Sequence, residues 1–103
     1  MLVLPIKKKW FDMIKSGEKK EEYREIKPYY TSRFDNMMGN DIKIDYELDA
    51  VTFLIVFRNG YSIFSPEMKC RCKLRKGTGR VEWGAEEGKE YYILDILEVL
   101  YAD

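Results

Sequence analysis

The spacing of apolar residues along the chain predicts an opening strand, a helix and a second strand. Residues 2–6 form a short apolar run, which is typical of a buried strand. Residues 7–16 predict a helix, because apolar side chains recur at helical spacing at Ile6, Trp10, Met13 and Ile14. Gly17 is a natural stop for this helix, so residues 19–26 are expected to leave it as a strand.

A second helix and an alternating segment follow. Pro28 favours the first turn of a helix that we expect to run to about Met37, with Gly39-Asn40 ending it. Residues 41–49 alternate between apolar and mostly acidic positions, which predicts a strand with one solvated acidic face. The inward side chains are expected to be Ile42, Ile44, Tyr46 and Leu48, and the outward carboxylates Asp41, Asp45, Glu47 and Asp49.

The most apolar segment lies in the middle of the chain. Residues 51–57 are apolar almost throughout, which indicates a strand buried on both faces or the centre of a closed barrel. Asn59-Gly60 is a strong hairpin signal, so residues 61–64 are expected to return as a strand.

The last part of the chain predicts three more strands, over residues 68–75, 80–83 and 90–100. The first of these alternates strictly, with Met68, Cys70, Cys72 and Leu74 on one face. The other face carries a row of four cations at strand spacing, formed by Lys69, Arg71, Lys73 and Arg75.

These elements fit one small domain. The chain has 103 residues, of which 46% are hydrophobic and 15% aromatic, so it can bury a modest core. Two helices among mostly antiparallel strands predict an α+β fold over residues 1–103, a small β-barrel with two short helices across its openings.

Composition limits which cofactors and which cellular location we expect for the protein. Cys70 and Cys72 are the two cysteines and there is no histidine, so reduced core thiols are expected and no metal or organic cofactor. The carboxylates of residues 41–49 lack the spacing of a calcium loop. No apolar run reaches the length of a membrane span, and no secretory signal is present. We therefore expect a cytoplasmic protein with no membrane partner.

Charge is distributed in blocks although the net charge is zero. The net charges of residues 1–33, 34–50, 51–80 and 81–103 are +4, −4, +6 and −6. A neutral total can hide a basic face that binds nucleic acid, and it can equally result from blocks that neutralise each other across adjacent strands.

One charged stretch between the first helix and the second strand resembles a known family signature. Gly17-x-Lys19-x-x-Glu22-x-Arg24 resembles the G-x-K-x-x-E-x-R motif of the ASCH domain, a member of the PUA-like superfamily of small β-barrels. Later features resemble the family in kind and in order, namely Asn59-Gly60-Tyr61, Glu82-Trp83-Gly84 and Tyr91-Tyr92. The resemblance covers most of the chain outside the acidic segment.

The resemblance implies a cleft at the helix–strand junction that binds RNA or modified nucleobases. It also implies that some members are hydrolases, which remove an acyl group from a modified cytidine or cleave RNA. In the deacylating group a threonine nucleophile follows the motif lysine, and Glu22 stands at that position here. The chain has the motif lysine, Lys19, but it lacks the threonine hydroxyl at position 22, which argues against deacylase activity in this protein.

Physical chemistry suggests what the motif residues can bind. Glu22 and Arg24 share one face of an extended strand, and Lys19 joins them only if it belongs to the turn after Gly17 or if a bulge intervenes. A carboxylate between two cations accepts from the exocyclic amine of cytosine, while Arg24 or Lys19 donates to base carbonyls or phosphate. The same flanked carboxylate is a weak general base.

The predicted ligand is therefore RNA or a nucleotide. The binding residues are expected to be Lys19, Glu22, Tyr23 and Arg24, extended along phosphates by Lys69, Arg71, Lys73 and Arg75. Exposed aromatics such as Tyr23, Tyr61 or Trp83 are candidates to stack on unpaired bases.

Two other functions remain open from the sequence. The first is a hydrolase of modified nucleosides or a ribonuclease of the same fold, with Lys19 and Glu22 as catalytic residues and a hydroxyl from Tyr23, Thr31 or Ser32. The second is a protein-interaction module, which is favoured if the charged blocks cancel and an apolar patch is exposed.

Overall fold

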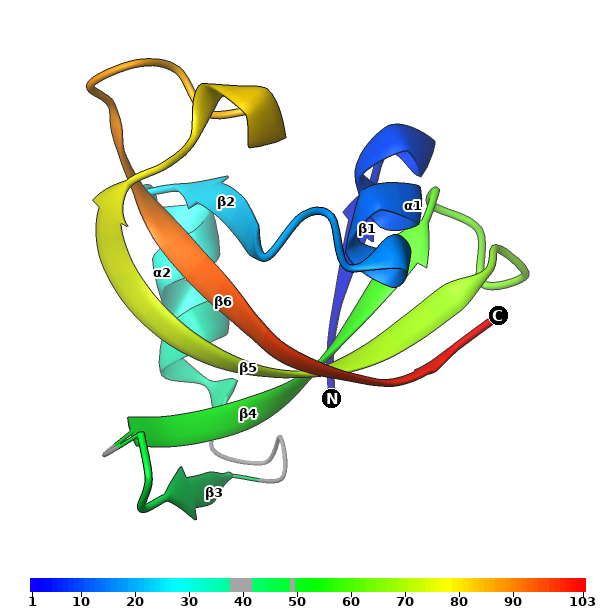
Figure 1. Cartoon of the computed structure of the whole chain (residues 1–103), viewed down its shortest axis with the longest axis horizontal. Coiled ribbons are helices and arrows are strands. Elements are labelled where there is room, and N and C mark those ends of the chain that lie inside the picture. The colour runs from blue at the N-terminus through cyan, green and yellow to red at the C-terminus, as the bar shows by residue number, and fades with distance from the viewer. Residues whose placement is uncertain (38–41, 49) are drawn as a thin grey trace.

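The structure, a computed structural model, describes residues 1–37, 42–48 and 50–103. It is a small α+β domain in which a curled mixed sheet forms a half-barrel accompanied by two helices (Figure 1). The elements in chain order are β1 (Leu2–Ile6), α1 (Lys8–Ser16), β2 (Glu21–Glu25), α2 (Pro28–Asp35), β3 (Lys43–Asp45), β4 (Ala50–Asn59), β5 (Glu67–Thr78), a 3₁₀ helix (Val81–Trp83) and β6 (Glu90–Ala102).

The sheet has the strand order β1-β4-β5-β6-β2, with β3 added to β4. β1 pairs with β4 in parallel, and β4–β5, β5–β6, β2–β6 and β3–β4 are antiparallel. Within the described residues, β1 and β2 end this order without pairing with each other. The predicted barrel is therefore a half-barrel, open between β1 and β2.

Two β-bulges accompany the bending of the long β5–β6 ribbon. The register shifts between Lys69 and Cys70 and again between Arg71 and Cys72, which leaves Leu100 and Leu97 of β6 without a partner. A bulge inserts one extra residue and increases the local twist, so the two bulges help to curl the ribbon around the core (Figure 1). Both unpaired leucines are exposed.

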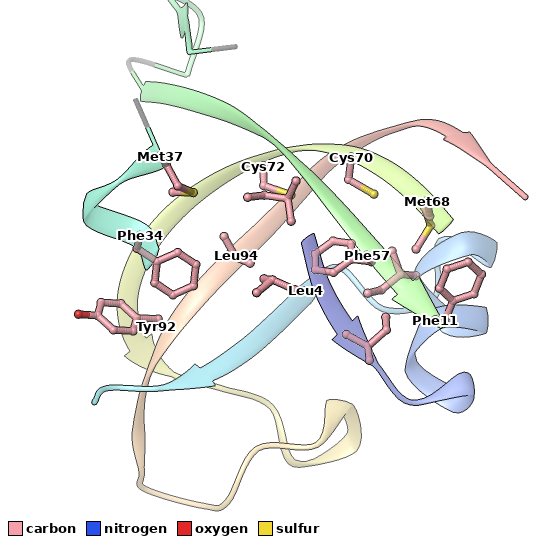
Figure 2. Packing of buried hydrophobic residues seen from close by; sticks show 13 residues of the cluster. Leu4, Phe11, Phe34, Met37, Phe57, Met68, Cys70, Cys72, Tyr92 and Leu94 are labelled. Carbon is pink, nitrogen blue, oxygen red and sulfur yellow. The ribbon is translucent and has the colours of Figure 1, made fainter. Parts of the chain in front are cut away.

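The main core fills the concave side of the half-barrel. Figure 2 shows Phe34, Met37 and Tyr92 at one end, Phe11 and Met68 at the other, and Leu4, Cys72 and Leu94 between them. Alternation along β6 directs Tyr92 and Leu94 into this core, whereas Tyr91 and Ile93 form a smaller cluster with Ala85. The strand is therefore buried on both faces over residues 91–94.

The strongest sequence patterns are confirmed. Residues 54–57 of β4 are all buried, as expected for a central strand, but Val51 is exposed and Phe53 is half-buried, so burial on both faces begins later than the predicted residue 51. Met68, Cys70 and Cys72 of β5 are buried on its inner face. In α1, Ile14 is buried as expected, but Phe11 is the other buried side chain, so the apolar face lies closer to Phe11 than the pattern predicted.

Several expected elements differ in the structure. Residues 61–64 do not return as a strand: the Asn59 N–H bonds the Pro66 carbonyl at 2.9 Å, so residues 60–65 form a longer loop before β5. Residues 80–83 were expected to be a strand, but Val81–Trp83 is a 3₁₀ helix that ends at Gly84 in the left-handed region, φ +102°.

The second helix and the acidic segment are also shorter than predicted. α2 ends at Asp35, where the Asn36 amide bonds the Ser32 carbonyl, and Gly39-Asn40 lies outside the described residues. Of residues 41–49, β3 takes only Lys43–Asp45. The side chains expected to face inward at Ile44, Tyr46 and Leu48 are exposed, and within the described residues β3 pairs with β4 alone, away from the main core.

None of the helices in the described residues has both the length and the apolar character that a membrane crossing requires. Residues 1–37, 42–48 and 50–103 contain no group of three or more His, Cys, Asp or Glu side chains placed to hold a metal ion.

The buried thiols predict loss of stability in alkali. Burial raises the pKa of Cys70 from 9.0 to about 12 and raises the pKa of Cys72 as well. Above pH 9 the unfolded chain loses thiol protons that the folded chain keeps, so the free energy of unfolding falls as pH rises. For two thiols the fall between pH 8 and pH 10 is about 2–3 kcal/mol. Urea unfolding at both pH values should show this fall in the free energy of unfolding for the wild type and a smaller fall for the double variant Cys70→Ala/Cys72→Ala. Equal pH dependence in the two proteins would contradict it.

Candidate functional site

The turn after α1 brings Lys19 to the same side as Glu22. Gly17 adopts φ +86°, and its N–H bonds the Ile14 carbonyl at 3.1 Å. The Lys19 N–H then bonds the Met13 carbonyl at 2.9 Å, so Lys19 belongs to this turn and not to β2. The strand alternation that would have separated Lys19 from Glu22 therefore does not apply.

The Glu22 carboxylate lies between two cations. Its Oε1 accepts a hydrogen bond from Lys19 Nζ and its Oε2 accepts one from Arg24 Nη2, both at 2.7 Å. Both ion pairs are largely out of solvent, because the Lys19 and Glu22 side chains are 1% and 7% exposed. Such groups are stable in the interior only when each charge is paired. We call Lys19, Glu22 and Arg24 the charge cluster.

Lys19 also links the cluster to the loop after β5. Its Nζ donates to the Trp83 carbonyl at 2.8 Å and lies 4.5 Å from the centre of the Trp10 ring. Gly84 lets the Trp10 ring lie close to the end of the 3₁₀ helix, because a Cβ at position 84 would be only 3.0 Å from Trp10 Cζ2. Burial lowers the pKa of the Lys19 ammonium from its usual 10.5, and the charge of Glu22 opposes that shift.

Arg24 connects the two open edges of the half-barrel. Its Nη2 donates to the Pro5 carbonyl on β1 at 3.0 Å as well as to Glu22. Its Nη1 donates to the Tyr30 hydroxyl at 3.4 Å, and its guanidinium lies 5.7 Å from the Tyr30 ring centre. Among the described residues, Arg24 Nε is a buried side-chain donor without a hydrogen-bond partner. A buried unpaired N–H costs about 1–3 kcal/mol, which the other bonds of Arg24 offset.

A cleft of about 570 Å³ lies above the charge cluster. This volume is within the range of about 300–1,000 Å³ that small-molecule sites occupy. Basic side chains outnumber acidic ones in its lining; the basic ones are Lys7, Lys8, Lys19, Arg24, Lys27 and Lys89, and the acidic ones are Glu22, Glu25 and Glu86. Aromatic rings complete the walls, contributed by Trp10, Tyr23, Tyr30, Tyr61, Trp83 and Tyr91.

The parallel pairing of β1 and β4 builds one side of the cleft mouth. Ile6 is the register partner of Asn59, so the next residues, Lys7 and Gly60, leave the sheet side by side. Tyr61 follows on the loop and is 90% exposed. A cation and a free aromatic ring therefore lie at the mouth, as expected for Tyr61 from the sequence.

Two other expected stacking residues are engaged elsewhere. The Tyr23 hydroxyl donates to Glu21 Oε1 at 2.8 Å and accepts from the Arg80 N–H at 2.9 Å. Burial raises the pKa of the Tyr23 phenol. Trp83 is half-buried, with Arg80 4.8 Å from its ring centre. Both rings line the cleft, but they form its walls and not an exposed platform.

The row of cations on β5 lies apart from the charge cluster. None of Lys69, Arg71, Lys73 and Arg75 lines the cleft. Arg75 Nε bonds Asp95 Oδ2 at 2.8 Å, Arg75 also pairs with Glu21, and Lys73 lies 3.9 Å from Asp95. Because Glu21 and Glu22 point to opposite faces of β2, this network lies on the outer face of the sheet. The acidic partners of Lys73 and Arg75 come from β6 and β2.

Of the hydroxyls proposed for a hydrolase, those of Thr31 and Ser32 lie outside the cleft lining. Thr31 Oγ1 bonds the Tyr92 hydroxyl, and Thr31 and Ser32 line a separate shallow surface on α2.

The third proposed hydroxyl belongs to Tyr23, which lines the cleft with its ring centre 5.3 Å from Lys19 Nζ. The bonds of Lys19 Nζ go to Glu22 and Trp83 and to no hydroxyl of the described residues. The arrangement can hold a ligand by charge and hydrogen bonding.

Sequence reasoning missed much of the cleft wall. Trp10 was assigned only to the apolar face of α1, and Lys7, Lys27 and Lys89 were not singled out. The register of β1 and β4 places Lys7 at the mouth, and the turn between β2 and α2 places Lys27 there. The one available signal was position, since each of these lysines lies at a junction: Lys7 begins a predicted helix, Lys27 lies between a predicted strand and helix, and Lys89 precedes the last predicted strand.

The chain was compared with protein-family models, curated proteins and solved structures, and none of them matched. The resemblance to ASCH domains therefore stays a prediction.

The buried charge cluster predicts a large effect at Glu22. Glu22→Gln keeps the shape of the side chain but leaves Lys19 and Arg24 buried without a counter-charge, and it should lower the free energy of unfolding by about 3 kcal/mol. Glu25→Gln, an exposed neighbour on β2, is the matched control and should change it by less than about 0.5 kcal/mol. Urea unfolding gives both values. A Glu22→Gln protein within about 1 kcal/mol of wild type would show that the ion pairs contribute little.

Proposed function

We propose that the chain is a PUA-like module that binds RNA or a nucleotide, with one base unit in the cleft above the charge cluster. The observation that carries the proposal is the mainly basic, aromatic-walled cleft, with the paired charges of Lys19, Glu22 and Arg24 among its lining residues. Base carbonyls and phosphates are hydrogen-bond acceptors, and arginine and lysine donate to both.

The other groups of the cleft suit the same ligand. Glu22 has a hydrogen bond to each carboxylate oxygen, and each oxygen keeps a further lone pair that can accept from an exocyclic amine. Lys7 and Lys27 add positive charge at the lining, which favours a phosphate. Tyr61 provides an exposed ring on which an unpaired base can stack.

A binding role agrees better with the cluster than a hydrolytic one does. Lys19 and Arg24 already donate to Glu22, which makes the carboxylate a poor general base. No hydroxyl of the described residues bonds Lys19. In this proposal Lys19, Glu22 and Arg24 form the floor of the cleft and orient the bound ligand. The cations of β5 do not contact the ligand, because they do not line the cleft.

A loop pair offers a matched test of this site. Tyr61 and Phe64 are both 90% exposed on the loop 60–65, but only Tyr61 lines the cleft. Tyr61→Ala should weaken binding of a short single-stranded RNA about 5-fold or more, because base stacking is lost, and Phe64→Ala should change it less than 2-fold. Fluorescence anisotropy with labelled pentanucleotides measures both.

Charge at the lining is tested in the same assay. Binding should weaken with salt, and Lys7→Gln should lower the slope of log K against log salt by about 0.7 if Lys7 contacts a phosphate. Lys20→Gln removes the same charge from an exposed position outside the cleft and should leave the slope unchanged. Absence of wild-type binding to RNA and to mononucleotides at low salt would reject the proposed function, and turnover of acylated nucleosides would then be the next assay.

A further inference from the structure

A second hollow of about 330 Å³ adjoins the cleft between β1 and α2. It shares Pro5, Arg24, Lys27, Tyr30 and Tyr61 with the cleft, so the two spaces are neighbours. Val3, Leu4, Tyr29 and Arg33 line this hollow and not the cleft. A ligand long enough to pass Arg24 can therefore occupy both spaces.

The charge of the second hollow is one-sided. Arg24, Lys27 and Arg33 line it, and none of its lining residues in the described chain is acidic. The cleft differs, because Glu22, Glu25 and Glu86 lie among its cations. The chemistry of the second hollow therefore suits an anion, whereas the cleft suits a group that both donates and accepts.

Two of the cations are held in place by α2. The Arg33 guanidinium lies 3.4 Å from the Tyr29 ring centre, and its Nη1 donates to the Tyr29 carbonyl at 3.0 Å. Lys27 Nζ lies 5.6 Å from the Tyr30 ring centre, and the rings of Tyr29 and Tyr30 meet edge to face at 5.0 Å. This ordering lowers the entropy that binding would otherwise cost.

Arg24 is shared by the two spaces. It lines both of them, and its guanidinium bonds the Glu22 carboxylate and the Pro5 carbonyl. These bonds fix the guanidinium in position, so its positive charge beside the second hollow does not depend on side-chain rotation.

We propose that the second hollow is a phosphate subsite, so that the preferred ligand carries a phosphate attached to the base unit in the cleft. This inference rests on the proposed function and names its substrate class. The phosphate contacts Arg24, Lys27 and Arg33. It belongs either to the terminus of a free nucleotide or to the internucleotide link of a single strand, which have the same chemistry at this position.

Calorimetric titration tests the subsite with four ligands per base: the ribonucleoside, its 5′- and 3′-monophosphates and the dinucleotide. At least one phosphorylated ligand should bind about 10-fold or more tightly than the nucleoside, as charge-assisted hydrogen bonds imply. Arg33→Gln should remove most of this gain and leave nucleoside affinity within 2-fold of wild type. Lys20→Gln, with the same loss of charge outside both spaces, should leave every affinity within 2-fold.

The outcomes separate the subsite from the proposed function. Equal wild-type affinity for nucleoside and phosphorylated ligands, or an equal loss for all ligands in Arg33→Gln, would overturn the subsite while binding in the cleft stands. Failure of every ligand to bind would overturn both. A dinucleotide that binds more tightly than either monophosphate would identify a strand as the source of the phosphate, and the reverse order would identify a free nucleotide.

Discussion

The buried carboxylate of Glu22 is the interaction on which the site depends. It pairs with Lys19 from the turn after α1 and with Arg24 from its own strand. Those two cations extend the connection, Lys19 to the Trp83 carbonyl and Arg24 to the Pro5 carbonyl. One carboxylate thus ties together the helix turn, the loop after β5 and the free edge of β1. Because buried charges are tolerated only when paired, none of the three side chains can be neutralised alone without leaving a partner unsatisfied.

The same interaction determines what the cleft can offer a ligand. Lys19 is engaged by protein acceptors and by the Trp10 ring, so it is a structural member of the floor more than a free cation. Arg24 is held by Glu22 and Pro5 and lines both the cleft and the hollow beside it. The cleft therefore combines a floor of paired charges with further lysines and an exposed tyrosine ring in its lining.

The neutral total charge separates onto two faces. On the outer face, cations of β5 meet Asp95 of β6 and Glu21 of β2, so part of the positive block 51–80 is cancelled by neighbouring strands. In the cleft and the hollow beside it, basic residues from β2, α2 and the segment before α1 exceed the acidic ones. The row of cations on β5 was the conspicuous charge signal in the sequence. The cleft and the hollow beside it are lined instead by basic residues that come from separate segments of the chain.

Local pattern in the sequence was enough to predict the elements with strong periodicity. The burial of residues 54–57 in β4 and the alternation of β5 follow from it, because these side chains are removed from water on folding. The end of α1 follows from Gly17, which adopts the left-handed backbone conformation of a helix stop.

The sequence also singled out Lys19, Glu22 and Arg24, but not that Lys19 faces Glu22. That depends on the folded turn, where a backbone bond from Lys19 to Met13 takes the lysine out of the strand. The loop at 60–65, the 3₁₀ helix and the cleft wall likewise depend on strand register and on contacts between distant segments, which leave no local pattern in a sequence.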